Sequence, residues 1–243
     1  MAKYKRTVRG GRLVASVLYT RPEPSDNKRT RAAKQRATSK ARQALNLKQS
    51  RQKFEFTMAA NFTPKDYHVV LTFDDANLPA DRAGAVACFR RFIRQLRTHR
   101  RARGQDVRYI YVVEGAHGDK RLHLHVILNA ASADDVELIR SLWVYGTQVN
   151  VEQLDGREFA VMAVYLTKER EDGKPVGAKS WVGSRNLTQP TVEHTYVGED
   201  DTLAAPAGCW VLERREETNE FGSFLYIKYI LPETGQSRMP NIL

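Results

Sequence analysis

The chain has 243 residues, of which 42% are hydrophobic and 28% charged, so it can form the core of one large domain or of one domain with an extension. No apolar run approaches the roughly 20 residues of a membrane span, and no signal-peptide core follows the basic start MAKYKRTVRG. Cys88 and Cys209 have no spacing pattern, so we exclude a disulfide framework and expect a reducing, cytoplasmic location.

Positive charge is concentrated at the start of the chain. The formal net charge is +11. Residues 1–53 contain 16 Lys and Arg against 2 Asp and Glu, whereas the other 190 residues contain 23 against 26. Such an arm predicts a polyanionic partner, above all nucleic acid. A solvated tail or a localisation signal is the alternative.

Residues 1–60 are expected to form this arm. LVASVLYT (13–20) indicates a short strand, RPEPSDN (21–27) a turn, and residues 28–56 a helix rich in Ala, Lys, Arg and Gln. The helix has few apolar residues, so we expect it to lie on DNA or to order only when DNA binds. The candidate DNA contacts in the arm are Lys28, Arg29, Arg31, Lys34 and Arg36.

A compact domain is expected over residues 61–243. Strands are predicted at 66–75, 106–115, 120–129 and 147–154, and helices at 78–104, 132–146 and 156–172. Asp81 and Ser132 are candidate helix caps, Gly118-Asp119 indicates a hairpin turn, and residues 209–231 predict a C-terminal hairpin. This order favours an α+β fold, with a central antiparallel sheet of about five strands flanked by helices, as in ferredoxin-like and RRM-like domains.

Two histidines occupy alternate positions in KRLHLHVILN (120–129). In a strand, His123 and His125 point to one face and the leucines between them to the other. The hairpin brings Glu114, at the end of the preceding strand, alongside. Two imidazoles and a carboxylate suit a divalent metal that also binds substrate oxygens. A solvated polar face is the alternative that this pattern alone leaves open.

A further motif lies on the last predicted helix, in VYLTKE (164–169). Tyr165 and Lys168 are three residues apart and share a helix face. A tyrosine hydroxyl with its ordinary pKa near 10 is a poor nucleophile, and a neighbouring cation favours the phenolate. Taken alone, the spacing favours a core tyrosine and a solvated lysine.

The order of these motifs resembles that of the HUH endonucleases, specifically the single-tyrosine Rep initiators of rolling-circle replication in viruses, phages and plasmids. LTF (71–73), HLH (123–125) and YLTK (165–168) match their three motifs, and Glu169 follows as in viral Reps. KSWVGSRNL (179–187) is similar to a tract of plasmid and phage replication proteins. No G-x-x-x-x-G-K-[ST] loop occurs, so we expect the helicase to come from the host.

The resemblance implies a nickase and strand transferase that works by transesterification. Tyr165 would attack a phosphodiester of single-stranded DNA, leaving a 5′-phosphotyrosine and a free 3′-hydroxyl, and Lys168 would steady the phosphate or the tyrosine oxygen. The hydroxyl would prime a host DNA polymerase at a hairpin replication origin. The implied ligands of Mg²⁺ or Mn²⁺ are His123, His125 and Glu114.

Other residues have less specific expectations. Arg185 and Asn186 are candidate DNA contacts, with a capped loop as the alternative. Asp74 and Asp75 are expected to form a turn, and Trp181 to be buried. The rival nucleophiles are Tyr109, Tyr111 and Tyr145, and no role is expected for His68 or His99.

Two other functions remain open. A conjugative relaxase or a single-tyrosine transposase would use the same chemistry, although relaxases generally place the tyrosine before the histidines. A non-catalytic RRM-like module would instead bind a single strand through aromatic residues on its sheet.

Overall fold

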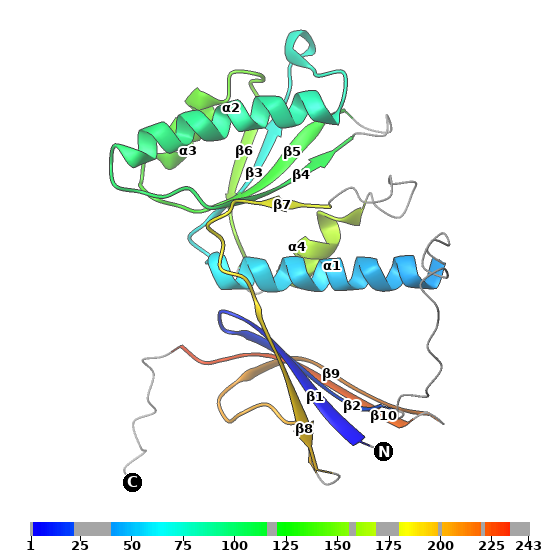
Figure 1. Cartoon of the computed structure of the whole chain (residues 1–243). Helices are drawn as coiled ribbons and strands as arrows, with labels where there is room; N and C mark the ends of the chain where they lie inside the picture. The colour runs from blue at the N-terminus through cyan, green and yellow to red at the C-terminus, as the bar shows by residue number, and fades with distance from the viewer. Residues whose placement is uncertain are drawn as a thin grey trace, which may run out of the picture. The chain divides into compact units, whose positions relative to one another are not determined.

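The computed structural model describes residues 2–21, 40–115, 121–155, 159–168, 180–198, 201–219 and 222–233. Its contacts divide the chain into two compact units, Met1–Gln49 with Gln189–Leu243, and Ser50–Thr188. Each unit has a five-stranded antiparallel sheet, which confirms the α+β expectation (Figure 1). In the described part of the chain, no helix is both long enough and apolar enough to cross a membrane.

The first unit joins the two ends of the chain. Its strand order is β8-β1-β2-β10-β9. The strands are β1 (Ala2–Gly10), β2 (Leu13–Arg21), β8 (Thr191–Val197), β9 (Trp210–Asn219) and β10 (Gly222–Ile230). Thus the strand expected at 13–20 and the C-terminal hairpin are confirmed. The expected division into residues 1–60 and 61–243 is not the one that the contacts give, because β1 pairs with β8 and β2 pairs with β10.

The second unit holds a sheet of order β6-β3-β5-β4-β7. Its strands are β3 (Tyr67–Thr72), β4 (Tyr109–Glu114), β5 (His123–Leu128), β6 (Val149–Gln153) and β7 (Val182–Gly183). Its helices are the last part of α1 (Lys40–Asn61), then α2 (Arg82–Arg101), α3 (Asp135–Leu142) and α4 (Phe159–Tyr165), with a short 3-10 turn at Asp75–Asn77. The four predicted strands of the central region and the hairpin of β4 and β5 are confirmed.

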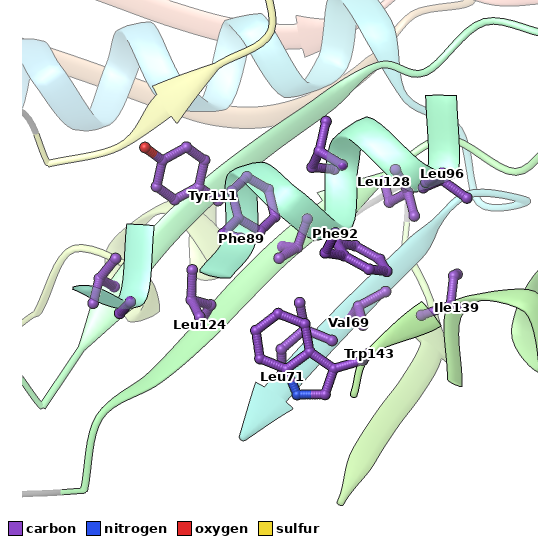
Figure 2. Packing of buried hydrophobic residues seen from close by; sticks show 14 of the residues in the cluster. Val69, Leu71, Phe89, Phe92, Leu96, Tyr111, Leu124, Leu128, Ile139 and Trp143 are labelled. Carbon is purple, nitrogen blue, oxygen red and sulfur yellow. The ribbon is translucent and has the colours of Figure 1, made fainter. Parts of the chain in front are cut away.

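Helices α2 and α3 cover one face of this sheet (Figures 1 and 2). Phe89, Phe92 and Leu96 of α2 pack onto alternate strand residues such as Leu71 and Leu124, and all five are buried. The expected cap of α2 is confirmed, since the Asp81 carboxylate accepts a hydrogen bond from the Gly84 backbone N–H at 2.8 Å. Burial of these large side chains is the main stabilising contribution on this face.

The opposite face is covered by α4 and the end of α1 (Figure 1). Phe54 and Met58 of α1 are fully buried against Ile110 and Ile127 of the sheet. The last turns of α1 are therefore part of the core, because they carry large apolar residues where we expected a helix that only contacts DNA. Residues 28–39 lie outside the described part of the chain.

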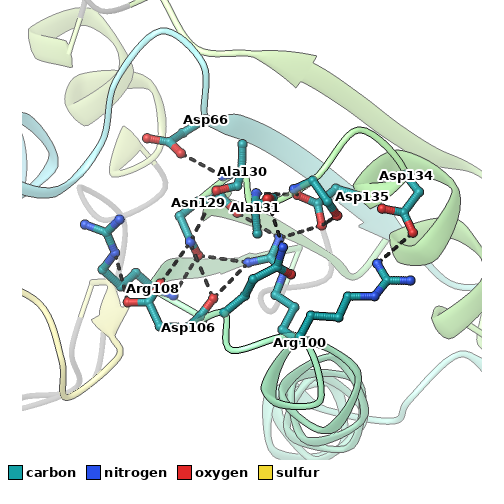
Figure 3. Close-up of polar contacts among 12 residues, drawn as sticks. Asp66, Arg100, Asp106, Arg108, Asn129, Ala130, Ala131, Asp134 and Asp135 are labelled. Carbon is teal, nitrogen blue, oxygen red and sulfur yellow. Dashed lines mark hydrogen bonds and ion pairs between the residues drawn. The ribbon is translucent and has the colours of Figure 1, made fainter.

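A buried ion pair fixes α2 against the start of α3 (Figure 3). Arg100 and Asp135 are 1% and 0% exposed in their side chains and approach to 3.1 Å. The Asp135 carboxylate also accepts hydrogen bonds from the backbone N–H groups of Ala131 and Ser132. Ser132 is therefore not the cap that the sequence predicted, because Asp135 holds this turn from inside the helix.

Candidate active site

Strand alternation gathers three polar side chains on the face that α4 covers. In the antiparallel pair of β4 and β5, Glu114 lies opposite His123, and Val112 lies opposite His125. Glu114 is the last residue of β4 and is followed by Gly115, whose φ of 84° turns the chain away from the strand. The ends of two neighbouring strands therefore place one carboxylate and two imidazoles side by side.

The three candidate ligand atoms form a small triangle. Glu114 Oε2 lies 2.8 Å from His125 Nε2 and 3.1 Å from His123 Nε2, and the two nitrogens are 3.2 Å apart. In an octahedral complex with bonds of about 2.1 Å, neighbouring ligand atoms are roughly 3 Å apart. The donor set and its spacing therefore fit one face of a six-coordinate divalent ion, with the other positions open.

The remaining ring nitrogens of both histidines also have partners. His123 Nδ1 lies 2.9 Å from the backbone oxygen of Arg121, which sets a tautomer with a proton on Nδ1 and leaves Nε2 free for a metal. His125 Nδ1 lies 3.1 Å from His68 Nε2, and the two rings stack with centroids 5.3 Å apart. His68, for which we expected no role, thus lies directly behind a candidate ligand. Only the pairing of β3 with β5 reveals this contact, because 57 residues separate the two histidines.

Burial keeps these imidazoles neutral. It lowers the pKa of His125 from 6.5 to about 4, an effect that the hydrogen bond with Glu114 opposes and that the neighbouring His68 and His123 reinforce. Burial likewise lowers the pKa of His68. Metal ligation requires neutral imidazole, so His125 has the required protonation state at neutral pH.

Helix α4 presents Tyr165 to this cluster. Phe159, Ala163 and Leu166 bury one side of the segment in the core, and Tyr165 ends the helix on the other side with 46% of its surface exposed. The Tyr165 ring packs edge-on against the His125 ring, with centroids 5.6 Å apart. The sequence motifs on the hairpin and on the helix therefore meet in space.

Lys168 bridges the tyrosine and the carboxylate. Its Nζ lies 3.9 Å from the centroid of the Tyr165 ring and 3.3 Å from Glu114 Oε1. The turn that carries it is fixed by Thr167, whose hydroxyl donates to the backbone oxygen of Ala163 at 2.7 Å and accepts from Arg51 Nε at 3.0 Å. A phenol, an ammonium and a candidate metal site thus share one surface, where an anionic substrate finds concentrated positive charge.

The rival tyrosines lie elsewhere. Tyr109 and Tyr111 point to the α2 face of the sheet, where both rings pack on Phe89. Tyr145 packs on Trp143 on that same face. None of the three reaches the histidine cluster, because strand alternation places it on the other side of the sheet.

Asp74 and Asp75 form the turn that the sequence predicted. Asp74 accepts a hydrogen bond from the backbone N–H of Thr147, and Asp75 forms an ion pair of 2.7 Å with Arg121. Neither carboxylate belongs to the Glu/His/His group.

Arg185 and Asn186 are not part of this cluster. Ser184 bonds to the backbone of Tyr109, at the first residue of β4, whereas Glu114 is its last. Five residue steps of strand separate these ends by roughly 17 Å. Trp181 stacks on Phe54 with centroids 5.1 Å apart, so it packs on the core as expected.

Seven residues discussed from the sequence lie outside the described part of the chain, and their predicted roles stay predictions: Lys28, Arg29, Arg31, Lys34, Arg36, His117 and Glu169.

Comparison with known proteins gives one match. Residues 66–170 match the model of a family of replication-associated proteins of the ORF2 type. Neither the curated proteins nor the solved structures contain a match to the chain. The matched segment begins just before β3 and contains the hairpin with Glu114, His123 and His125, helix α4 with Tyr165, and Lys168. The segment of this chain from residue 66 to residue 170 therefore belongs to the ORF2-type replication-associated protein family, in keeping with a Rep-type replication initiator.

Proposed function

We propose that this protein is a metal-dependent endonuclease that nicks and rejoins single-stranded DNA at a replication origin, through a covalent link to Tyr165. The observation that carries the proposal is the packing of the Tyr165 ring against His125, beside the group of Glu114, His123 and His125. The family match supports a role in replication.

The proposed reaction is a transesterification. Tyr165 Oη loses its proton to solvent and attacks the phosphorus of one phosphodiester, while the bond from phosphorus to the 3′-oxygen breaks. The leaving oxygen takes up a proton and becomes a free 3′-hydroxyl, and the 5′-phosphate stays on the tyrosine. A later 3′-hydroxyl reverses these steps, so the energy of the phosphodiester bond is kept.

Three of the chain's residues would hold Mg²⁺ or Mn²⁺: Glu114, His123 and His125. Such an ion acts as a Lewis acid that polarises the phosphate oxygens. Lys168 lies beside both Tyr165 and Glu114, where its ammonium would bind the phosphate and balance the charge that develops on it. A host polymerase would extend the free 3′-hydroxyl, with unwinding by a host helicase.

The test is covalent capture of DNA. The wild-type protein is incubated with a single-stranded oligonucleotide library and Mn²⁺, and protein–DNA adducts are separated on a denaturing gel. We expect Tyr165→Phe to form no adduct and EDTA to prevent adduct formation by the wild type. Tyr109→Phe is the matched control, because its ring lies on the opposite face of the sheet. An adduct on Tyr165→Phe would show that another residue is the nucleophile.

The same chemistry would serve a single-tyrosine transposase or a relaxase. Selection of the cleaved sequences from the library separates these functions, since an initiator prefers an origin and a transposase prefers the hairpins at element ends. DNA binding that is insensitive to EDTA, without cleavage of any sequence, would favour the non-catalytic module instead.

A further inference from the structure

Helix α2 carries a strongly one-sided charge. Its sequence, RAGAVACFRRFIRQLRTHRR, holds seven arginines and no acidic residue. Four of the arginines are exposed and follow one another at spacings of four, three and four residues, which places them on one side of the helix, one per turn. We name this set the α2 arginine stripe: Arg90, Arg94, Arg97 and Arg101. From the first to the last, the stripe covers about 17 Å of helix.

The charge of the stripe is not neutralised within the described part of the chain. Arg100 and Arg103, from the same region, each have a carboxylate partner, Asp135 at 3.1 Å and Asp134 at 2.7 Å (Figure 3). By contrast, no carboxylate of the described residues forms an ion pair with any member of the stripe. Arg97 lies 5.6 Å from the ring centroid of Tyr109, a contact that orients the guanidinium and keeps its charge.

Like charges one turn apart repel each other, so the stripe destabilises the free helix slightly. A polyanion laid along it would remove this repulsion and release its own counterions. The guanidinium group also matches phosphate in geometry, because it donates two parallel hydrogen bonds.

The stripe and the candidate active site lie on opposite sides of the sheet. Helix α2 covers one face, and Glu114, His123, His125 and Tyr165 lie on the other (Figure 1). DNA along α2 is therefore a different segment from the one at Tyr165. Helix α2 also exposes no aromatic side chain, since Phe89 and Phe92 are buried in the core, and single-strand binding surfaces usually stack bases on aromatic rings.

We propose that the α2 arginine stripe binds the phosphate backbone of duplex DNA that adjoins the single-stranded cleavage site. This inference rests on the proposed function for DNA as the partner, and it adds a second contact surface that holds the duplex part of the origin. It reads no sequence, because guanidinium contacts to phosphate carry none.

The test uses the full chain with all four stripe arginines changed to glutamine, which has a similar helix propensity. Binding of a fluorescent 20-base-pair duplex is measured by anisotropy over a series of salt concentrations. Each lost phosphate contact lowers the slope of log K against log salt by about 0.9. We expect the slope to fall by two to four such steps, and cleavage of a short single-stranded oligonucleotide to stay as in the wild type.

Three further variants make the result specific. Changing the four arginines to lysine keeps the charge, and we expect it to retain most of the salt slope. Lys65→Gln, at an exposed position before β3, is the single-charge control for Arg94→Gln, which also serves if the fourfold glutamine variant does not fold. Tyr165→Phe should bind the duplex normally, so failure of the cleavage chemistry is separable from failure of this inference.

Duplex binding with an unchanged slope in the fourfold glutamine variant would overturn the proposal. So would an equal loss of short single-strand cleavage in a variant with unchanged thermal stability, because the stripe would then contact the single strand. Retained DNA binding together with loss of binding to an acidic protein would assign the surface to a protein partner, and would also overturn it.

Discussion

The sharpest prediction concerns His68, which lies behind the candidate metal ligand His125. We consider the change His68→Phe, because phenylalanine keeps an aromatic ring that can stack on His125 and removes only the nitrogen that accepts its Nδ1 proton. His125 is 4% exposed, so water has little access to replace the lost acceptor.

Two outcomes are open to His125 in this variant, and both weaken metal binding. If the proton stays on Nδ1, a buried N–H group loses its partner, at a cost of about 1–3 kcal/mol. If the proton moves to Nε2, the nitrogen that faces Glu114 can no longer act as a ligand. Loss of a comparable hydrogen bond behind a metal ligand lowers metal affinity about 10- to 100-fold, or roughly 1.4–2.7 kcal/mol.

The assay is a titration of the metal-free protein with Mn²⁺, in which the free ion is counted by its electron paramagnetic resonance signal. We expect the dissociation constant to rise at least 10-fold in His68→Phe and less in His68→Gln, whose amide oxygen can accept the proton. His99→Gln, an exposed histidine on α2, is the control. Unchanged Mn²⁺ affinity in a folded His68→Phe protein would refute the reasoning, whereas absence of binding by the wild type would refute the metal site itself.

Three other predictions test the electrostatics. Lys168→Gln should slow adduct formation on the order of 100-fold without weakening Mn²⁺ binding, since the ammonium lies beside Tyr165 and competes for the carboxylate; gel kinetics and the titration above measure both. Because the pKa of His125 is lowered to about 4, the folded state binds fewer protons than the unfolded chain between pH 4 and 6.5. In EDTA, thermal melts should therefore show a Tm that falls as the pH drops through this window, and less so for His125→Gln. Asp135→Ala should lower the free energy of unfolding by about 3–5 kcal/mol in urea titrations, because it leaves the buried Arg100 without its partner.

Local patterns determined much of the second unit from the sequence alone. Alternation predicted β4 and β5 and placed His123 and His125 on one face, and helical spacing with the Asp81 cap predicted α2. These predictions were confirmed because each depends on residues a few positions apart, whose relative directions are fixed by strand or helix geometry.

Other features depend on contacts between distant segments. The sequence suggested a basic arm at the start of the chain, yet β1 is a sheet strand, because its partner β8 begins more than 180 residues later. The role of the final turns of α1 as core, and the position of His68 behind His125, likewise follow from packing and strand pairing. Local pattern cannot rank such pairings, since burial and register are settled only when the whole sheet forms.

The candidate site shows both levels. Its ligand types and their shared strand face were set by the order of residues in the hairpin and its neighbour. Whether a phenol 40 residues further along would reach them was decided by the apolar side of α4, which packs into the core and turns Tyr165 toward His125. Hydrophobic burial acts without direction or sequence range, so only the assembled tertiary structure brings the two motifs together.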